Sequence, residues 1–273
     1  MRTIALPVAL AWLSVAGIPQ ATAAPDLVVS REWLASHLSD PAVVVIATGQ
    51  VASFNAKHIA GARFLAHEDT MDATHRLLEP AELSKALAKA GGRDDARIVL
   101  YGNDAMTTGW VYMAFAAIGH GDHVSILDGN IEAWQRDGRP TSSEVRANAS
   151  TRITVKPAPD VIVDRKWVSE KLKSPEVHLL DVRSVSERDR GFIPGSTLVL
   201  WQELFQDLSL LTFKSKTEIR ALLTRAGLTP GQQAVTYCAV GMRASLMYFA
   251  ARYAGVPARV YVGSWQDWSR GVY

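Results

Sequence analysis

The sequence repeats itself along its length, and this repeat constrains the fold of the 273-residue chain more than any other feature. A segment that begins at Asp26, DLVVSREWLASHL, matches a segment that begins at Asp160, DVIVDRKWVSEKL, 134 positions later. The same offset aligns Trp134 with Trp268 near the end of each repeat. We therefore expect two copies of one unit of about 115 residues, because domains of this size can fold around a core of their own.

Each repeat alternates short apolar segments with amphipathic ones. Residues 43–48 and 177–182 are runs of mostly branched apolar side chains, which is typical of strands buried on both faces of a sheet. Residues 82–91 and 217–227 carry apolar side chains at helical spacing and end at a glycine. Strands that alternate with helices predict an α/β fold class, with a mainly parallel sheet flanked by helices in each unit.

The segment between the repeats differs from both in composition. Residues 141–160 are polar and have two prolines near their end, which indicates a linker. We therefore expect a first domain at residues 26–140 and a second at residues 161–273.

The first 23 residues are typical of a secretory signal peptide. They combine one cation, an apolar run of about 15 residues and the small residues ATA at positions 21–23. The apolar run is shorter than the roughly 20 residues that span a bilayer, so a membrane anchor is disfavoured. We expect residues 1–23 to be removed, and the mature protein to be periplasmic or secreted with no membrane attachment.

The charge balance argues against a nucleic-acid partner. The formal net charge is +2, and no block of Lys and Arg residues of the kind that binds phosphate backbones is present.

The chain contains one cysteine, Cys238, at the end of the apolar segment 233–238. A single cysteine cannot form a disulfide within the chain. Residues 243–254 have a helical pattern, and Gly241 allows a tight turn between strand and helix. Such a turn presents a side chain at the carboxyl edge of a parallel sheet and directs free helix N–H groups at an anion there. The position favours a reactive thiol over the commoner role of a lone cysteine as a small buried hydrophobe.

Four motifs, in order, resemble those of the rhodaneses, a family of thiosulfate and 3-mercaptopyruvate sulfurtransferases. The active-site loop of the family is similar to CAVGMR at residues 238–243, and its Asp-x-Arg-Ser and Gly-His-Ile-Pro-Gly motifs are similar to DVRSVSERDRGFIPGS at 181–196. The segments that close its two domains are similar to LDGNIEAWQRDGRP at 127–140 and GSWQDW at 263–268. The resemblance implies two tandem rhodanese-like domains, the first inactive and the second catalytic.

Loop length separates this interpretation from a phosphatase of related architecture. Protein phosphatases of that kind use Cys-x5-Arg, a loop wide enough for a tetrahedral phosphate. The interval from Cys238 to Arg243 is one residue shorter, the length associated with sulfur transfer, so we favour a sulfurtransferase.

The resemblance implies a two-step reaction through a persulfide on Cys238. A small anionic donor such as thiosulfate gives its sulfane sulfur to Cys238, and cyanide or a thiol then accepts it. The loop backbone and the Arg243 charge would hold the anionic sulfurs, and two further arginines are candidates for the oxyanion end of the donor. A structural ion pair is the alternative role for one of them, Arg183. The candidate substrate-binding residues are Arg243, Arg188, Arg183, Ala239, Val240, Gly241 and Met242.

The first repeat lacks these functional groups. At an offset of 136, Cys238 aligns with Gly102 and Arg243 with Thr107. The first domain is therefore expected to be a structural partner that forms one wall of a cleft over Cys238, because ligand pockets favour domain interfaces.

Several questions stay open at this level. Ala239 and Val240 are neither the basic residues typical of thiosulfate-preferring members nor the Gly-Ser of mercaptopyruvate-preferring ones; we favour thiosulfate because Arg243 is cationic. A 3-mercaptopyruvate sulfurtransferase remains an alternative. So do a persulfide carrier that delivers sulfur to a protein acceptor without fast turnover, and a catalytically silent binding domain.

The implied chemistry requires no metal and no organic cofactor. The sequence HGDH at residues 120–123 contains metal-ligating side chains, but it lies in a predicted helix-to-strand loop of the first repeat. We interpret it as a solvated turn.

Overall fold

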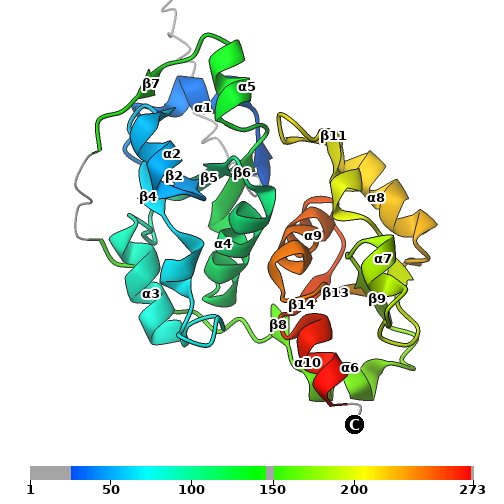
Figure 1. Cartoon of the computed structure of the whole chain (residues 1–273). Coiled ribbons are helices and arrows are strands. Elements are labelled where there is room, and N and C mark those ends of the chain that lie inside the picture. Colours follow the sequence, from blue (N-terminus) through cyan, green and yellow to red (C-terminus); the bar gives the residue numbers. More distant parts are fainter. Residues whose placement is uncertain (1–25, 146–150, 272–273) are drawn as a thin grey trace, which may run out of the picture.

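The computed structural model describes residues 26–145 and 151–271, which form two α/β units side by side (Figure 1). The predicted signal peptide, residues 1–23, lies outside the described residues. No helix within the two described ranges combines the length and the apolar character needed to cross a bilayer.

The first unit is built on a five-stranded parallel sheet in the order β1-β6-β5-β2-β4. Its strands are β1 (Val28–Val29), β2 (Val43–Thr48), β4 (Arg63–Leu65), β5 (Arg97–Gly102) and β6 (Val124–Leu127). The helical segments are α1 (Arg31–His37), α2 (Val51–Ala56), η1 (His67–Thr70), α3 (Pro80–Lys89), α4 (Ala105–Ala117), η2 (Gly121–His123) and α5 (Ile131–Arg136). A short antiparallel pair joins β3 (His58–Ile59) to β7 (Thr141–Ser142), so the predicted linker begins with a paired strand.

The second unit repeats this topology, with the sheet order β10-β9-β13-β14-β8 and only parallel neighbours. Its strands are β8 (Ile162–Val163), β9 (Val177–Asp181), β10 (Thr197–Leu198), β13 (Gln233–Tyr237) and β14 (Ala258–Tyr261). The helical segments are α6 (Arg165–Lys171), α7 (Val185–Arg188), η3 (Trp201–Leu204), α8 (Lys216–Arg225), α9 (Met242–Tyr253) and α10 (Ser264–Arg270). A hairpin of β11 (Phe205–Asp207) and β12 (Thr212–Phe213) projects from it.

These elements confirm the α/β fold class predicted from the duplicated pattern. The run 43–48 is strand β2, and the run 177–182 is strand β9, which ends one residue earlier. Helices α3 and α8 are each followed by a glycine at φ +95°, Gly91 and Gly227, in the left-handed conformation expected where a helix stops.

The two units meet mainly through α4 and α9, which lie side by side in Figure 1. Both helices are buried along most of their length, and their side chains belong to one continuous apolar core. A Cβ atom added to Gly109 in α4 would lie 2.6 Å from Cα of Leu246 in α9, so the helix backbones are in direct contact. This contact fixes how the two units face each other.

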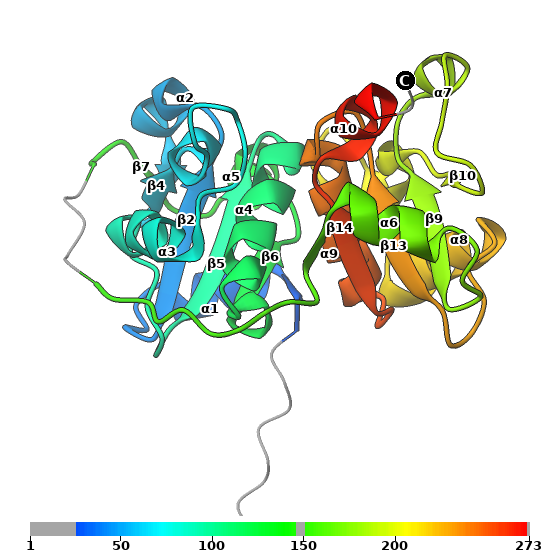
Figure 2. The same ribbon diagram turned by 90° about the horizontal axis from the view of Figure 1, so that it is seen from below.

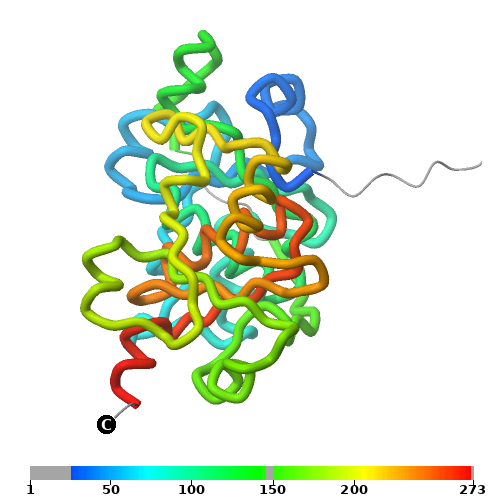
Figure 3. Tube along the Cα trace, turned by 90° about the vertical axis from the view of Figure 1, so that its right-hand side faces the viewer, coloured from blue at the N-terminus to red at the C-terminus, as the bar shows by residue number. Residues whose placement is uncertain are grey.

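Each unit also extends a hairpin-like segment over the other. The β11–β12 hairpin reaches the first unit, where Asn130 donates its backbone N–H to the carbonyl of Leu210 at 2.9 Å. Figure 3 shows this hairpin, in yellow, beside the end of the first unit that carries α5. The equivalent segment of the first unit, residues 67–78, is closed by a bridge between Met71 and Leu77 and lies toward β8 and α10 of the second unit (Figure 1).

The described part of the predicted linker is a strap packed on the first unit rather than a free chain (Figure 2). Ile153 is buried in the core, and the Thr154 carbonyl lies 2.6 Å from Nε2 of His120. His120 is 1% exposed, whereas Asp122 and His123 are exposed. The HGDH turn is therefore solvated only in part, because the strap covers its first histidine.

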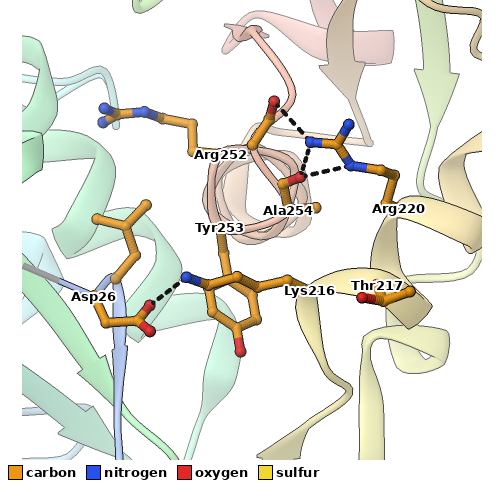
Figure 4. Close-up of a pocket in the computed structure, with 9 residues that line it drawn as sticks. Asp26, Lys216, Thr217, Arg220, Arg252, Tyr253 and Ala254 are labelled. Atoms are coloured by element: carbon orange, nitrogen blue, oxygen red, sulfur yellow. Dashed lines mark hydrogen bonds and ion pairs between the residues drawn. The ribbon is translucent and has the colours of Figure 1, made fainter. Parts of the chain in front are cut away.

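A hollow of about 490 Å³ opens between the units at the carboxyl end of α9 (Figure 4). The charged side chains that line it form ion pairs or hydrogen bonds with other groups of the protein. Lys216 lies 3.1 Å from the Asp26 carboxylate across the two units, Arg220 donates to the Ala254 carbonyl at 2.6 and 3.0 Å, and Arg252 donates to the Tyr112 hydroxyl at 2.8 Å. These contacts link the two units and provide a hydrogen-bond donor for a carbonyl group at the carboxyl end of α9.

Replacing Gly109 with alanine tests the helix contact. Helix propensity alone would stabilise α4 by about 1 kcal/mol, because alanine is the better helix former. The steric conflict with Leu246 costs about 1–3 kcal/mol as overpacking. We expect Gly109→Ala to lower the free energy of unfolding, measured by urea denaturation. A stabilised variant would show that the two backbones are not in contact.

Candidate active site

The Cys238 side chain lies inside a tight loop between β13 and α9. Its Sγ accepts the backbone N–H of Gly241 at 3.1 Å, and Cys238 is fully buried. Gly241 has φ +97°, in the left-handed region, and a Cβ atom there would lie 2.9 Å from the carbonyl oxygen of Val262. Glycine is therefore required at this position for the loop to curl around the sulfur.

The remaining predicted loop residues differ in exposure. Ala239 is half-buried and Val240 is 51% exposed, so the apolar side chain of Val240 faces outward. Met242 is the first residue of α9, and the free N–H groups of a first helical turn favour negative charge. The loop thus brings together the thiol and the start of a helix, as the sequence predicted.

Ser264, at the start of α10, holds the loop from the other side. Its Oγ accepts the backbone N–H of Cys238 at 3.0 Å and donates to the Tyr261 carbonyl at 2.9 Å. Trp265 donates its backbone N–H to the Cys238 carbonyl at 2.9 Å. Sequence reasoning treated GSWQDW as a closing motif only and missed Ser264. Its place in that motif, after a glycine and before a helix, was the available signal.

Arg243 is bound by a carboxylate that sequence reasoning also missed. Its Nη1 and Nη2 donate to the two carboxylate oxygens of Glu187, each at 2.7 Å. The hydrogen bonds from Arg243 lower the pKa of Glu187 to about 2, so Glu187 is ionised at neutral pH. The same pairing raises the pKa of Arg243, with a smaller contribution from the nearby Cys238. Arg243 therefore does not bring an unopposed positive charge to the loop, which removes the sequence argument for thiosulfate.

Arg183 takes the structural role that the sequence left open. Its side chain is 1% exposed, and its Nε and Nη2 donate to the Asp181 carboxylate at 2.9 and 2.7 Å. Nη2 also donates to the Gly191 carbonyl at 2.8 Å. The guanidinium is thus enclosed by protein acceptors, and the structure does not bring it into contact with the Cys238 loop.

Arg188 contacts the same carboxylate. Its Nη1 is 3.2 Å from Asp181 Oδ2, and its Nη2 donates to the Ser196 carbonyl at 2.6 Å. The guanidinium carbon lies 4.1 Å from the ring centroid of Phe192, and the side chain is 20% exposed. The role of Arg188 in binding a donor stays a prediction.

A cavity of about 1120 Å³ lies between the two units beside the loop. The second unit contributes Val240, Met242 and Val262, and the first unit contributes residues of the 67–78 segment. The first unit thus forms one wall of the cavity next to the Cys238 loop, as the sequence predicted.

The equivalent loop of the first unit has neither a thiol nor the space for one. A Cβ atom on Gly102 would lie 2.5 Å from Oγ1 of Thr48 and 2.9 Å from Oγ1 of Thr108. The Asp104 carboxylate caps α4 by accepting the backbone N–H groups of Met106 at 2.8 Å and Thr107 at 3.4 Å. An internal carboxylate therefore occupies the start of α4, which is the first unit's counterpart of the α9 start beside Cys238.

Comparison with known proteins agrees with this arrangement. A rhodanese-like domain is matched twice, at residues 30–137 and 164–270, so the chain belongs to the rhodanese-like family. A Mycobacterium tuberculosis protein named "Putative thiosulfate sulfurtransferase" is 30% identical over 266 residues, covering 89% of this chain and 94% of that protein. The sulfur carrier protein TtuD of Thermus thermophilus is 30% identical over 270 residues, with the same coverage.

Solved structures show the same fold. SseA from Escherichia coli, described as a 3-mercaptopyruvate sulfotransferase, superposes with a TM-score of 0.79 at 23% identity, over 88% of this chain and 99% of that chain. EanB in complex with ergothioneine superposes with a TM-score of 0.80 at 22% identity, over 90% of this chain and 68% of that chain.

The pKa of Glu187 leads to a pH-dependent stability prediction. Because the pKa is lowered from 4.5 to about 2 in the folded protein, the Glu187–Arg243 pair stabilises fully above about pH 4.5. This stabilisation is lost as the pH falls toward 2. Because solvent screens this partly exposed pair and Ser184 contributes to the shift, Glu187→Gln should cost about 1–2 kcal/mol of unfolding free energy at pH 7, and the cost should shrink on acidification.

The matched control is Glu218→Gln in α8. Glu218 forms the same capping box, with Ser215, but no arginine of residues 26–145 or 151–271 forms an ion pair with it. Denaturant unfolding at pH 7, 4 and 3 compares the two variants, and the Glu187 variant should lose more at pH 7. An equal loss in both, or a loss independent of pH, would contradict a stabilising ion pair.

Proposed function

We propose that this chain is a sulfurtransferase that moves a sulfane sulfur from thiosulfate, or a similar donor, through a Cys238 persulfide to cyanide or a thiol. The observation that carries the proposal is the position of the Cys238 Sγ, enclosed by the loop at the start of α9 with the Gly241 N–H directed at it. The names of the mycobacterial relatives support thiosulfate as the donor. The charge of Arg243 does not support thiosulfate as the donor, since Glu187 neutralises that charge.

The reaction follows from this geometry in two displacements. The Cys238 thiolate attacks the outer sulfur of thiosulfate, the donor S–S bond breaks, and sulfite leaves with the electron pair. The acceptor then attacks the outer sulfur of the persulfide, and Cys238 leaves as a thiolate. The Gly241 N–H stabilises the negative charge on Sγ before the first step and after the second.

Burial of the thiol has two consequences for this mechanism. Cys238 has no exposed surface, so donor binding requires a local movement of the surroundings of the sulfur. The same enclosure would protect a persulfide from water and from other thiols. This second property favours the alternative function of a persulfide carrier, which is the function named for the relative TtuD.

Two measurements on the purified protein and its Cys238→Ser variant test the proposal. Incubation with thiosulfate should add one sulfur atom to the wild-type mass and none to the variant. Steady-state turnover of thiosulfate with cyanide should fall by about a thousandfold or more in the variant, because the nucleophile is lost. A sulfur adduct without turnover would favour the carrier. An unmodified wild-type protein would exclude both functions.

We further propose that the protein acts after export, in the periplasm or outside the cell. The proposal rests on the sequence of residues 1–23. Expression of the full chain in a Gram-negative host should yield a periplasmic protein that begins at Ala24, as read by N-terminal sequencing. A full-length protein retained in the cytoplasm would contradict export.

A further inference from the structure

A tryptophan of the first unit packs against the Cys238 loop. Trp110 lies in α4 and has no exposed surface. A Cβ atom placed on Gly241 would lie 3.3 Å from Cζ3 of Trp110 and 2.9 Å from the carbonyl oxygen of Val262. Gly241 is therefore enclosed between the indole ring of the cysteine-free unit and the segment that precedes α10. The residue on which the ring packs is the one whose N–H contacts Sγ of Cys238 at 3.1 Å.

The indole ring is also held by a hydrogen bond within the first unit. Its Nε1 donates to Oγ1 of Thr70 at 2.9 Å, and both groups are buried. Thr70 ends η1 within the 67–78 segment, where its Oγ1 donates to the His67 carbonyl at 2.6 Å and its carbonyl accepts the Leu78 N–H at 2.9 Å. A buried side chain whose N–H is bonded in this way is rigid. The ring thus joins the wall of the cavity to the Cys238 loop.

The duplication places an equivalent residue beside the loop of the first unit. At the offset of 136 that aligns Cys238 with Gly102, Trp110 aligns with Leu246. Leu246 lies in α9, and it lines the same small space as Gly102. Each unit therefore presents this position to the loop of the other unit. The unit that contacts the Cys238 loop has a large ring with a bonded N–H there, and the other has an aliphatic side chain.

We propose that Trp110 of the cysteine-free unit is a positioning residue for the reaction at Cys238, which keeps the loop closed with the Gly241 N–H directed at Sγ. The inference rests on the proposed sulfurtransferase function and adds a residue of the first unit to its machinery. Trp110 takes no part in bond making. Without the ring the loop can relax, and its N–H then stabilises the negative charge on Sγ less. Both displacements involve that thiolate, as the nucleophile in the first and the leaving group in the second.

The pH profile of alkylation tests this role without requiring sulfur transfer. Iodoacetamide reacts with the thiolate of Cys238, and the chain has no other cysteine. Trp110→Phe shortens the ring system and removes the hydrogen bond to Thr70. The profile should move to higher pH by up to about one unit, because a hydrogen bond to the thiolate is weakened. A change in access to the buried sulfur would instead scale the rate at every pH and leave the position of the profile unchanged.

The matched control is Trp134→Phe. Trp134 is also a fully buried tryptophan of the first unit, and its Nε1 donates to the Pro140 carbonyl at 2.9 Å. It packs in an apolar core that, within residues 26–145 and 151–271, contains side chains of the first unit only. The control should lose stability in urea, as Trp110→Phe does, and keep the wild-type pH profile. With thiosulfate below saturation, persulfide formation should slow about tenfold in Trp110→Phe and less than about twofold in the control.

An unchanged profile in Trp110→Phe, or the same displacement in both variants, would overturn the inference. If Trp110→Phe does not fold, Thr70→Val decides, since it keeps the ring and removes the acceptor of its N–H. Its profile should also move to higher pH, and an unmoved profile would count against the inference in the same way. Failure of the proposed function itself is distinguishable. The wild-type protein would then form no persulfide with thiosulfate, while the alkylation profiles would still report on Trp110.

Discussion

Direct packing of α4 against α9 fixes the position of the two units relative to each other, and the site depends on that position. The contact at Gly109 and Leu246 lets the helix backbones touch, so their side chains merge into one core. With the units fixed in this way, each hairpin-like segment reaches the loop end of the opposite sheet. The cavity beside Cys238 is consequently a property of the pair of units. A separated second unit would keep the loop and lose one wall.

The two units share one topology but differ in the loop that precedes α4 in the first unit and α9 in the second. In the first unit the Asp104 carboxylate caps α4, Gly102 leaves no room for a side chain, and apolar residues of the second unit fill the space above. In the second unit the start of α9 faces the Cys238 sulfur, and the space above remains open. An internal carboxylate thus stabilises the helix start of the unit without a cysteine, while the helix start of the other unit lies beside the Cys238 sulfur, where negative charge is favoured.

Local signals in the sequence were sufficient for the fold and for the Cys238 loop. Apolar periodicity placed β2, β9, α3 and α8, and the glycine at position 241 indicated the left-handed turn that the loop adopts. Contacts between distant residues could not be predicted in this way. Glu187 binds Arg243 across 56 positions, and only the placement of α7 beside the loop brings them together. The role of Arg183 was ambiguous for a different reason. The sequence is the same whether its guanidinium binds substrate or pairs with Asp181.

We propose above all that Cys238 carries the transferred sulfur inside the loop at the start of α9. A crystal structure of the protein after treatment with thiosulfate tests it most directly. We expect one additional sulfur atom bonded to Sγ of Cys238, within hydrogen-bonding distance of loop backbone N–H groups and directed toward the cavity between the units. An unmodified Cys238 after treatment, or an added sulfur directed away from that cavity, would contradict it.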